Sequence, residues 1–221
     1  MKLQKVKNRS VLFTFHTESG WDLNLHLIRG KVHNFIIDTG LGSLCIAPIL
    51  EYIGQDAKPI IVVNTHHHWD HVWGNSAMMG RTILSHKLCR EMITSKWEVM
   101  LLKNSHYQCG EAKIHLPNLT FEEELYFPED KIRVLYTPGH TIDSISILDE
   151  EEGVLNAGDN VGDTLDEIIP SLDCSKELYL ETLLKYRQLD FDTLLSGHNV
   201  ILGKDIIGEI ENHVNAKILE E

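Results

Sequence analysis

The sequence predicts an α/β protein, because short apolar runs with the character of strands alternate with longer segments of helical periodicity. Residues 59–64 are rich in β-branched side chains, whereas residues 86–105 and 176–188 repeat apolar positions at helical spacing. Composition agrees: 43% of the 221 residues are hydrophobic and 24% are charged. A chain of this length can bury a substantial core, so we expect one domain, 1–221.

The first half is predicted to begin with strands. Apolar and polar residues alternate in residues 11–38, which predicts three strands, and a helix is expected at residues 43–54 despite an internal proline. The buried strand at residues 59–64 follows. A short strand at 81–85 then leads into an amphipathic helix at 86–105, which either packs on the core or caps a site.

The second half is predicted to mix strands and helices. Expected strands lie at 131–136, 144–148, 153–157 and 192–196, and expected helices at 176–188 and 204–219. The acidic tract 149–153 is expected to form a solvated turn. In the first of these two helices, Leu180, Leu183 and Leu184 are expected to face inward.

One stretch of seven residues, Thr65 to His71, concentrates metal-ligand chemistry directly after a predicted strand. Four of its side chains are of types that bind divalent metals, namely His66, His68, Asp70 and His71. In an extended segment, alternate residues share one face, so His66, His68 and Asp70 would lie together and His67 would point away. A turn at 70–71 would direct the last two side chains at a second ion. Four ligands cannot complete two coordination shells, so other segments must contribute.

Three later segments repeat one arrangement, in which an apolar strand is followed by a glycine turn and then by a ligand-type residue. They end at His140, Asp159 and His198. Rigid strands with functional residues on their terminal loops are the usual support of a catalytic site.

With these residues in this order, the chain resembles the metallo-β-lactamase-fold superfamily of hydrolases. The resemblance spans most of the chain and implies a four-layer αβ/βα sandwich. It also implies that His66, His68 and His140 bind one metal ion, and that Asp70, His71 and His198 bind the other. Asp159 would bridge the two ions, opposite a bridging water or hydroxide.

The ligand set predicts an open, catalytic metal site. Closed structural zinc sites usually use four ligands with cysteines among them, whereas this set contains no cysteine. We therefore expect two divalent ions, Zn²⁺ first and iron or manganese as alternatives, with the pKa of a bound water lowered to about 7. Asp70 is the expected catalytic residue, which orients the nucleophile and passes a proton to the leaving group. Asp38 either orients the ligand loop, as the resemblance implies, or only forms an Asx turn.

Departures from known branches narrow the function that the resemblance implies. Antibiotic-hydrolysing members place a cysteine or histidine near the position of Asp159, and glyoxalase II enzymes carry a C-terminal helical domain, whereas only 23 residues follow His198 here. Acyl-homoserine-lactone lactonases have a tyrosine soon after the bridging aspartate, which this chain lacks. We expect a dinuclear metallohydrolase of a small ester, thioester or lactone. The alternatives are an iron-dependent sulfur dioxygenase-like oxidoreductase, a phosphodiesterase, or a regulatory protein that kept its metals.

Charge and cysteine content bear on partners and location. The formal net charge is −13, which opposes binding of nucleic acid, so we expect a small-molecule substrate. The four cysteines form no close pair, and the sequence shows neither a signal peptide nor a membrane span, so we expect a cytoplasmic protein with no membrane partner. Trp69 and Trp73 flank the ligand loop and are expected either to form an apolar wall beside the metals or to pack into the core under the loop. With such a wall, the expected substrate is small, neutral and hydrophobic on its acyl side. The best further candidates for a pocket wall lie at 97–107.

Overall fold

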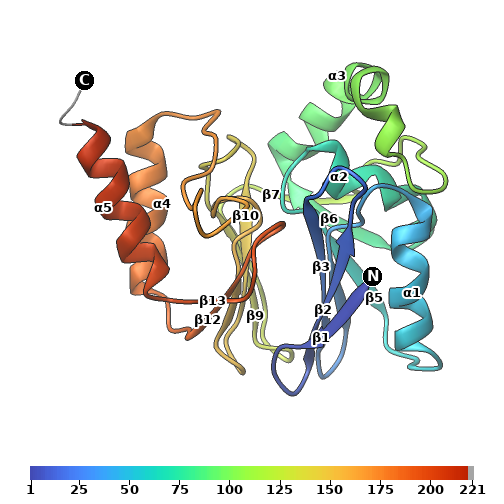
Figure 1. Ribbon diagram of the computed structural model, residues 1–221. Helices are drawn as coiled ribbons and strands as arrows, with labels where there is room; N and C mark the ends of the chain where they lie inside the picture. The colour runs from blue at the N-terminus through green and yellow to red at the C-terminus, as the bar shows by residue number, and fades with distance from the viewer. Residues whose placement is uncertain (219–221) are drawn as a thin grey trace.

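The computed structural model describes residues 1–218, which form two β-sheets packed face to face with helices on both outer faces (Figure 1). The first sheet has seven strands and the second has six, and both are mixed. This arrangement confirms the predicted α/β class and the four-layer αβ/βα sandwich.

The first sheet follows the chain order. Its strands are β1 (Lys2–Lys5), β2 (Ser10–His16), β3 (Asp22–Arg29), β4 (Asn34–Ile37), β5 (Ile60–Val63), β6 (Thr82–His86) and β7 (Leu119–Phe121). Strands β1 to β4 pair antiparallel, and β4 to β7 pair parallel. The parallel pairs are connected through helices α1 (Ser43–Ile53), α2 (Trp69–Val72) and α3 (Lys87–Asn104) and the short 3₁₀ helices η1 (Trp73–Met78) and η2 (Ser105–Tyr107), as parallel strands require long crossovers.

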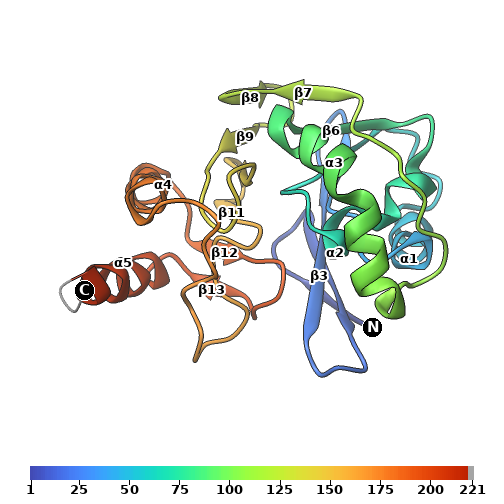
Figure 2. The ribbon, with the colours of Figure 1, turned by 90° about the horizontal axis from the view of Figure 1, so that it is seen from above.

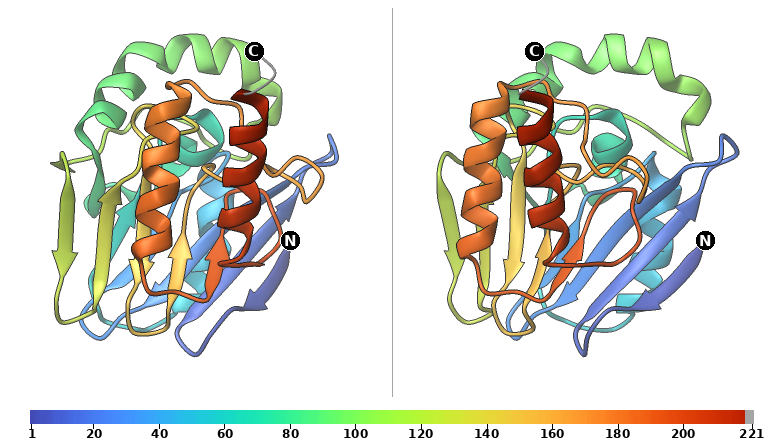
Figure 3. Two further views of the ribbon diagram at one scale, coloured as in Figure 1. Left: turned by 90° about the vertical axis from the view of Figure 1, so that its left-hand side faces the viewer. Right: turned by 60° about the vertical axis from the view of Figure 1, so that its left-hand side comes forward.

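The second sheet has the spatial order β13-β12-β11-β10-β9-β8. These strands are β8 (Glu124–Phe127), β9 (Ile132–Tyr136), β10 (Ile145–Asp149), β11 (Val154–Asn156), β12 (Thr193–Leu195) and β13 (Leu202–Gly203). Helices α4 (Lys176–Gln188) and α5 (Ile206–Ile218) lie side by side over its outer face (Figure 3). No helix within residues 1–218 combines the length and apolar character that crossing a bilayer would demand.

The central core lies between the two sheets and holds them together. Aliphatic side chains of β4 and β5 meet those of β9 and β10, and Phe35 and Ile147 are fully buried there. Burying one such side chain stabilises the fold by about 1.5–3 kcal/mol relative to exposing it. The inner sheet faces therefore fix how the strand ends of the two halves meet.

Some local expectations from the sequence are wrong. Strand β1 was not predicted. Asp149 is buried and binds the Arg9 guanidinium, so the acidic tract is not wholly solvated. Leu184 is 48% exposed, because its position on α4 faces away from the sheet, whereas Leu183 is buried. Helix α5 begins two residues later than predicted, and Leu219, its predicted last residue, lies outside the described residues.

Candidate metal centre

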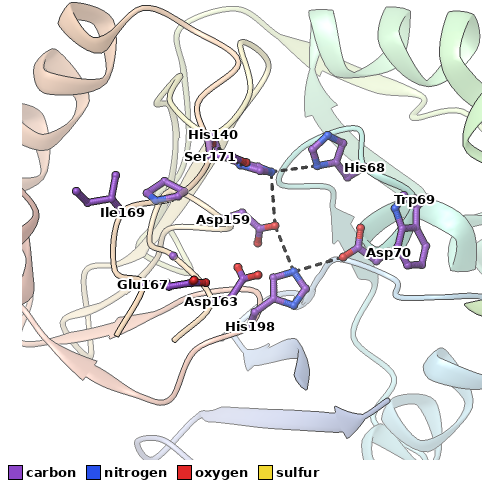
Figure 4. A pocket seen from close by; sticks show the side chains of 12 residues that line it. His68, Trp69, Asp70, His140, Asp159, Asp163, Glu167, Ile169, Ser171 and His198 are labelled. Carbon is purple, nitrogen blue, oxygen red and sulfur yellow. Dashed lines mark hydrogen bonds and ion pairs between the residues drawn. The ribbon is translucent and has the colours of Figure 1, made fainter. Parts of the chain in front are cut away.

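The seven predicted ligands meet at one end of the sandwich, where strands of both sheets terminate. Figure 4 shows those that line the pocket, namely His68, Asp70, His140, Asp159 and His198. The loop after β5 carries His66 and His68, helix α2 carries Asp70 and His71, and the loop after β9 carries His140. The loops after β11 and β12 carry Asp159 and His198. The structure therefore brings together every residue that the sequence singled out as a ligand.

The ligand loop changes conformation midway, which sorts its side chains. His68 still has an extended backbone, and helix α2 starts at Trp69. The prediction that Asp70 continues the extended face of His66 and His68 is therefore wrong. Asp70 lies on the helical turn beside His71 instead, and this turn directs both of them to the second group of ligands.

The ligand atoms form three overlapping groups in which all atoms lie within 4.8 Å of one another. The groups are His66, His68 and His140; Asp70, His71 and His198; and His66, His71 and Asp159. The first two groups have the same members as the two triads that the resemblance implied. Asp159 Oδ2 lies 3.6 Å from His66 Nε2 and 3.2 Å from His71 Nε2, so one carboxylate oxygen faces both triads. This is the position that a bridging ligand requires.

Three of the histidine ligands are held in place by a hydrogen bond from Nδ1, the ring nitrogen that does not face the carboxylate of Asp159. His71 Nδ1 donates to Asp38 Oδ2 at 2.8 Å, His140 Nδ1 to the Ser171 carbonyl at 2.8 Å, and His198 Nδ1 to the Asp22 carbonyl at 2.7 Å. Each bond orients the imidazole and leaves its Nε2 lone pair for a metal. The Ser171 and Asp22 partners were not identified from the sequence, because they are backbone carbonyls distant in the chain, whereas Asp38 was.

Asp38 orients the ligand loop, as the resemblance implied. It has a left-handed backbone (φ 62°) directly after β4, and its carboxylate accepts bonds from both the backbone N–H and the hydroxyl of Thr65, each at 2.7 Å. Together with the His71 bond, these contacts tie the start of the loop to its last ligand. Asp38 therefore does more than form a turn.

The glycines of the repeated strand–glycine–ligand arrangement are needed for close packing. A Cβ atom at Gly197 would lie 2.1 Å from Asp159 Oδ1 and 2.8 Å from His71 Cε1. A Cβ atom at Gly139 would lie 2.4 Å from Asn160 Oδ1, which accepts a bond from the His140 backbone N–H. A side chain at Gly197 would displace the ligands themselves, and one at Gly139 would displace the Asn160 side chain that holds the His140 backbone.

Two histidines of the first triad have lowered pKa values, whereas both histidines of the second triad have raised pKa values. Burial lowers the pKa of His68 to about 4, helped by His140, and burial and the neighbouring His71 hold the pKa of His66 well below its usual value. Burial opposes protonation of His71 and His198 too, but Asp159 and Asp70 raise the pKa of both well above the usual value. The carboxylates thus demand positive charge, which protons or metal ions can supply, so metal binding would release protons.

Several buried atoms of the cluster make no hydrogen bond within residues 1–218. His66 Nε2, His71 Nε2 and Asp159 Oδ1 are buried without any hydrogen bond among the described residues. Leaving such atoms unsatisfied costs about 1–3 kcal/mol each. Imidazole nitrogens and carboxylate oxygens converging in this way suit Zn²⁺ and other first-row divalent ions, so the residues present fit two metal ions.

A pocket of about 370 Å³ opens over the cluster. Trp69 forms part of its wall, as predicted, and stacks on Tyr107 with ring centroids 5.1 Å apart. Trp73 does not, because it is fully buried in the core under the loop. Figure 4 shows Asp163 and Glu167 on the side of the centre opposite Trp69. These two carboxylates were not singled out from the sequence.

His67 faces away from both triads but has its own interactions. It is 1% exposed, and its Nδ1 lies 2.9 Å from Asp143 Oδ1, in a residue that is fully buried. Its Nε2 lies 3.1 Å from the Nζ of Lys96 on α3. The sequence contains one indication that Lys96 lies beside the site. Lys96 shares a helix face with Val99, Met100 and Lys103, at spacings of three, four and seven residues, in the segment expected to supply a pocket wall.

A family model described as the metallo-beta-lactamase superfamily matches residues 21–198. A solved metallo-beta-lactamase from Pontibacter korlensis superposes with a TM-score of 0.75 over 97% of this chain and 98% of its own, at 17% sequence identity. At that identity the likeness shows the fold alone.

Curated relatives have higher sequence identity but are longer. The beta-lactamase-like protein 2 homolog of Drosophila melanogaster is 28% identical over 197 residues, which cover 87% of this chain and 63% of the relative. Human acyl-coenzyme A thioesterase MBLAC2 is 26% identical over 170 residues, which cover 66% of this chain and 61% of the relative. The chain thus spans less than two thirds of either relative.

Proposed function

We propose that this chain, which belongs to the metallo-β-lactamase superfamily, is a dinuclear metal-dependent hydrolase of a small acyl compound, with a thioester preferred over an ester or lactone. The observation that carries the proposal is the position of Asp159 Oδ2, 3.2–3.8 Å from histidine nitrogens of both triads. Such a shared carboxylate suits two neighbouring ions rather than one. Nitrogen-rich shells without cysteine favour Zn²⁺, with iron and manganese as alternatives.

In this proposal His66, His68 and His140 hold one ion, Asp70, His71 and His198 hold the other, and Asp159 contacts both. Bound there, divalent ions would lower the pKa of a coordinated water from about 15.7 to about 7 and polarise an acyl carbonyl. Asp70 lines the pocket and is only 8% exposed, so its carboxylate can orient a water molecule and transfer its proton to the leaving group. Trp69 shields this region from bulk solvent.

Two considerations support a thioester. One relative carries the name acyl-coenzyme A thioesterase, although at 26% identity. A thiolate is also a good leaving group, since the pKa of a thiol is about 8.5, so its departure makes little demand on Asp70 as a general acid. The remaining expectations from the sequence are also proposals: one domain over 1–221, a cytoplasmic location, and no nucleic-acid partner.

The test combines metal analysis with a substrate panel. Protein purified without chelator is expected to carry two ions per chain, and chelation is expected to abolish activity that zinc restores. The panel contains a thioester, an ester, a lactone and a phosphodiester, chosen so that their leaving groups are similarly reactive. We expect kcat/KM for the thioester to exceed that for each of the others by about tenfold or more.

Asp70→Asn is expected to lower kcat by about 10²–10⁴-fold, the usual contribution of a general acid–base group, while much of the metal remains bound. One iron per chain together with oxygen consumption would identify an oxidoreductase and contradict the proposal. A preference for the phosphodiester would contradict the substrate class but not the metal site. Loaded protein that turns over none of the panel would favour a regulatory protein.

A further inference from the structure

A second cavity, of about 470 Å³, adjoins the pocket over the metal centre. The two cavities share His68 and Trp69 in their linings, so a molecule can extend from one into the other around these side chains. The far wall of the second cavity is helix α3, which runs alongside the ligand loop and α2 (Figure 2). A substrate at the metal centre that is long enough to pass these two side chains would place one of its ends against α3.

The α3 face of this cavity combines apolar and positively charged residues. Val99 and Met100 line it beside Lys96 and Lys103. Within residues 1–218, no carboxylate lies within ion-pair distance of either lysine. In a chain with a formal charge of −13, two lysines without acidic partners beside a catalytic pocket leave a local positive surface that a negative ligand can use.

Lys96 is held in place by the buried pair of His67 and Asp143. His67 is buried, and a neutral imidazole satisfies both of its contacts: Nδ1–H donates to Asp143 Oδ1 at 2.9 Å, and Nε2 accepts from Lys96 Nζ at 3.1 Å. The ammonium group has three donors, so two remain for a ligand. A lysine held by a buried pair loses less side-chain freedom on binding than a free surface lysine.

The opposite side of the metal centre has the opposite charge. Asp163 and Glu167 line the first pocket across from Trp69 and His68 (Figure 4). Ile169 and Pro170 lie beside them in the same lining. A negatively charged group is therefore repelled on this side, and an uncharged, apolar group is accepted.

We infer that Lys96 and Lys103 bind the negatively charged part of the substrate's leaving group, and that His67 and Asp143 position Lys96. The inference rests on the proposed hydrolase function. The substrate is then an uncharged acyl group joined through a thioester to a thiol that carries phosphate or carboxylate groups. Water attacks the acyl carbon, the carbon–sulfur bond breaks, and the thiol leaves with a proton while the acid is released. The acyl part of this substrate is uncharged, as expected from the sequence, but its thiol part is negatively charged, so the whole substrate is not neutral.

The experiment uses one acyl group on three thiols: coenzyme A, which carries phosphates, glutathione, which carries carboxylates, and the neutral N-acetylcysteamine. Wild-type protein is expected to show a lower KM for at least one anionic thioester than for the neutral one. The better anionic thiol identifies whether phosphate or carboxylate is the natural group. Because the contact is electrostatic, higher ionic strength is expected to reduce this advantage.

Lys96→Met and Lys103→Met test the site, and Lys87→Met is the matched control. Lys87 lies on the same helix but outside the cavity, where it pairs with Glu122. Lys96→Met is expected to raise KM for the anionic thioester about tenfold or more, the usual effect of losing a bond to a charged group, with kcat within about twofold and metal content unchanged. Neither the neutral thioester nor Lys87→Met is expected to show this effect.

Asp143→Asn and Lys96→Arg test the positioning. Asp143→Asn is expected to raise KM for the anionic thioester alone, whereas Lys96→Arg keeps the charge and is expected to recover most of the binding. Equal effects of Lys96→Met on neutral and anionic thioesters, or no effect on either, would overturn the inference while leaving the hydrolase intact. Failure of the loaded wild-type protein to hydrolyse any of the three thioesters would instead refute the proposed function.

Discussion

Substituting His67 and His68 one at a time should separate folding from metal binding, although the two residues are adjacent. His67 contacts buried Asp143, whose other oxygen, Oδ2, already lacks a hydrogen-bond partner. His67→Ala would leave this carboxylate without its 2.9 Å donor in a site from which water is excluded. Breaking a buried pair by removing one partner costs about 3–5 kcal/mol, a large share of the 5–15 kcal/mol by which domains are stable.

His68→Ala should behave in the opposite way. His68 is a candidate ligand whose Nδ1 lies 3.1 Å from His140 Nε2, and no carboxylate depends on it for a hydrogen bond. Its removal is expected to lose metal from the first triad but to change the unfolding free energy of the metal-free protein by about 1 kcal/mol or less. His67→Ala is expected to keep two metal ions per chain under metal saturation.

The assay is urea unfolding followed by tryptophan fluorescence, with excess chelator present so that lost metal affinity does not count as lost stability. Metal content is measured separately on saturated protein. Asp143→Asn removes the buried charge, so it should make His67→Ala less costly, with a coupling energy of about 1 kcal/mol or more. Equal metal loss in the two alanine variants, or equal stability of both, would show that the two faces of the loop are wrongly assigned.

Three further predictions concern the ligand bridge, the glycine turn and a buried histidine. Asp159→Asn should weaken both metal sites together, so metal titration that shows one unchanged site would contradict the shared ligand. Gly197→Ala should abolish metal binding, because its Cβ would lie 2.1 Å from Asp159 Oδ1, whereas Gly208→Ala, with no atom within 4 Å, should leave binding intact and stabilise helix α5 by up to about 1 kcal/mol. Burial lowers the pKa of His26 from 6.5 to about 4, so the unfolded chain takes up its proton first and stability should fall by about 3 kcal/mol as pH drops from 6.5 to 4. His26→Leu should flatten urea-unfolding stability over this range, and an unchanged pH profile would refute this account.

The candidate ligands could be named from the sequence because each depends on a local pattern. A histidine or aspartate that follows an apolar strand and a glycine turn is placed at a strand end by short-range geometry, and strand ends meet at one edge of a sandwich. The same locality explains why most helices and strands were predicted, since apolar periodicity reports which face of an element is buried.

Only the tertiary structure decided what surrounds the ligands. Trp69 and Trp73 are four residues apart with the same chemistry, yet one lines the pocket and the other is fully buried, because the packing of α3 differs at the two positions. The contacts of His67 with Asp143, 76 positions away, and with Lys96, 29 positions away, exist because the turn before β10 and helix α3 are packed against the loop. Sequence spacing fixes directions within one element, whereas contacts between elements depend on how the sheets and helices pack, which no local pattern records.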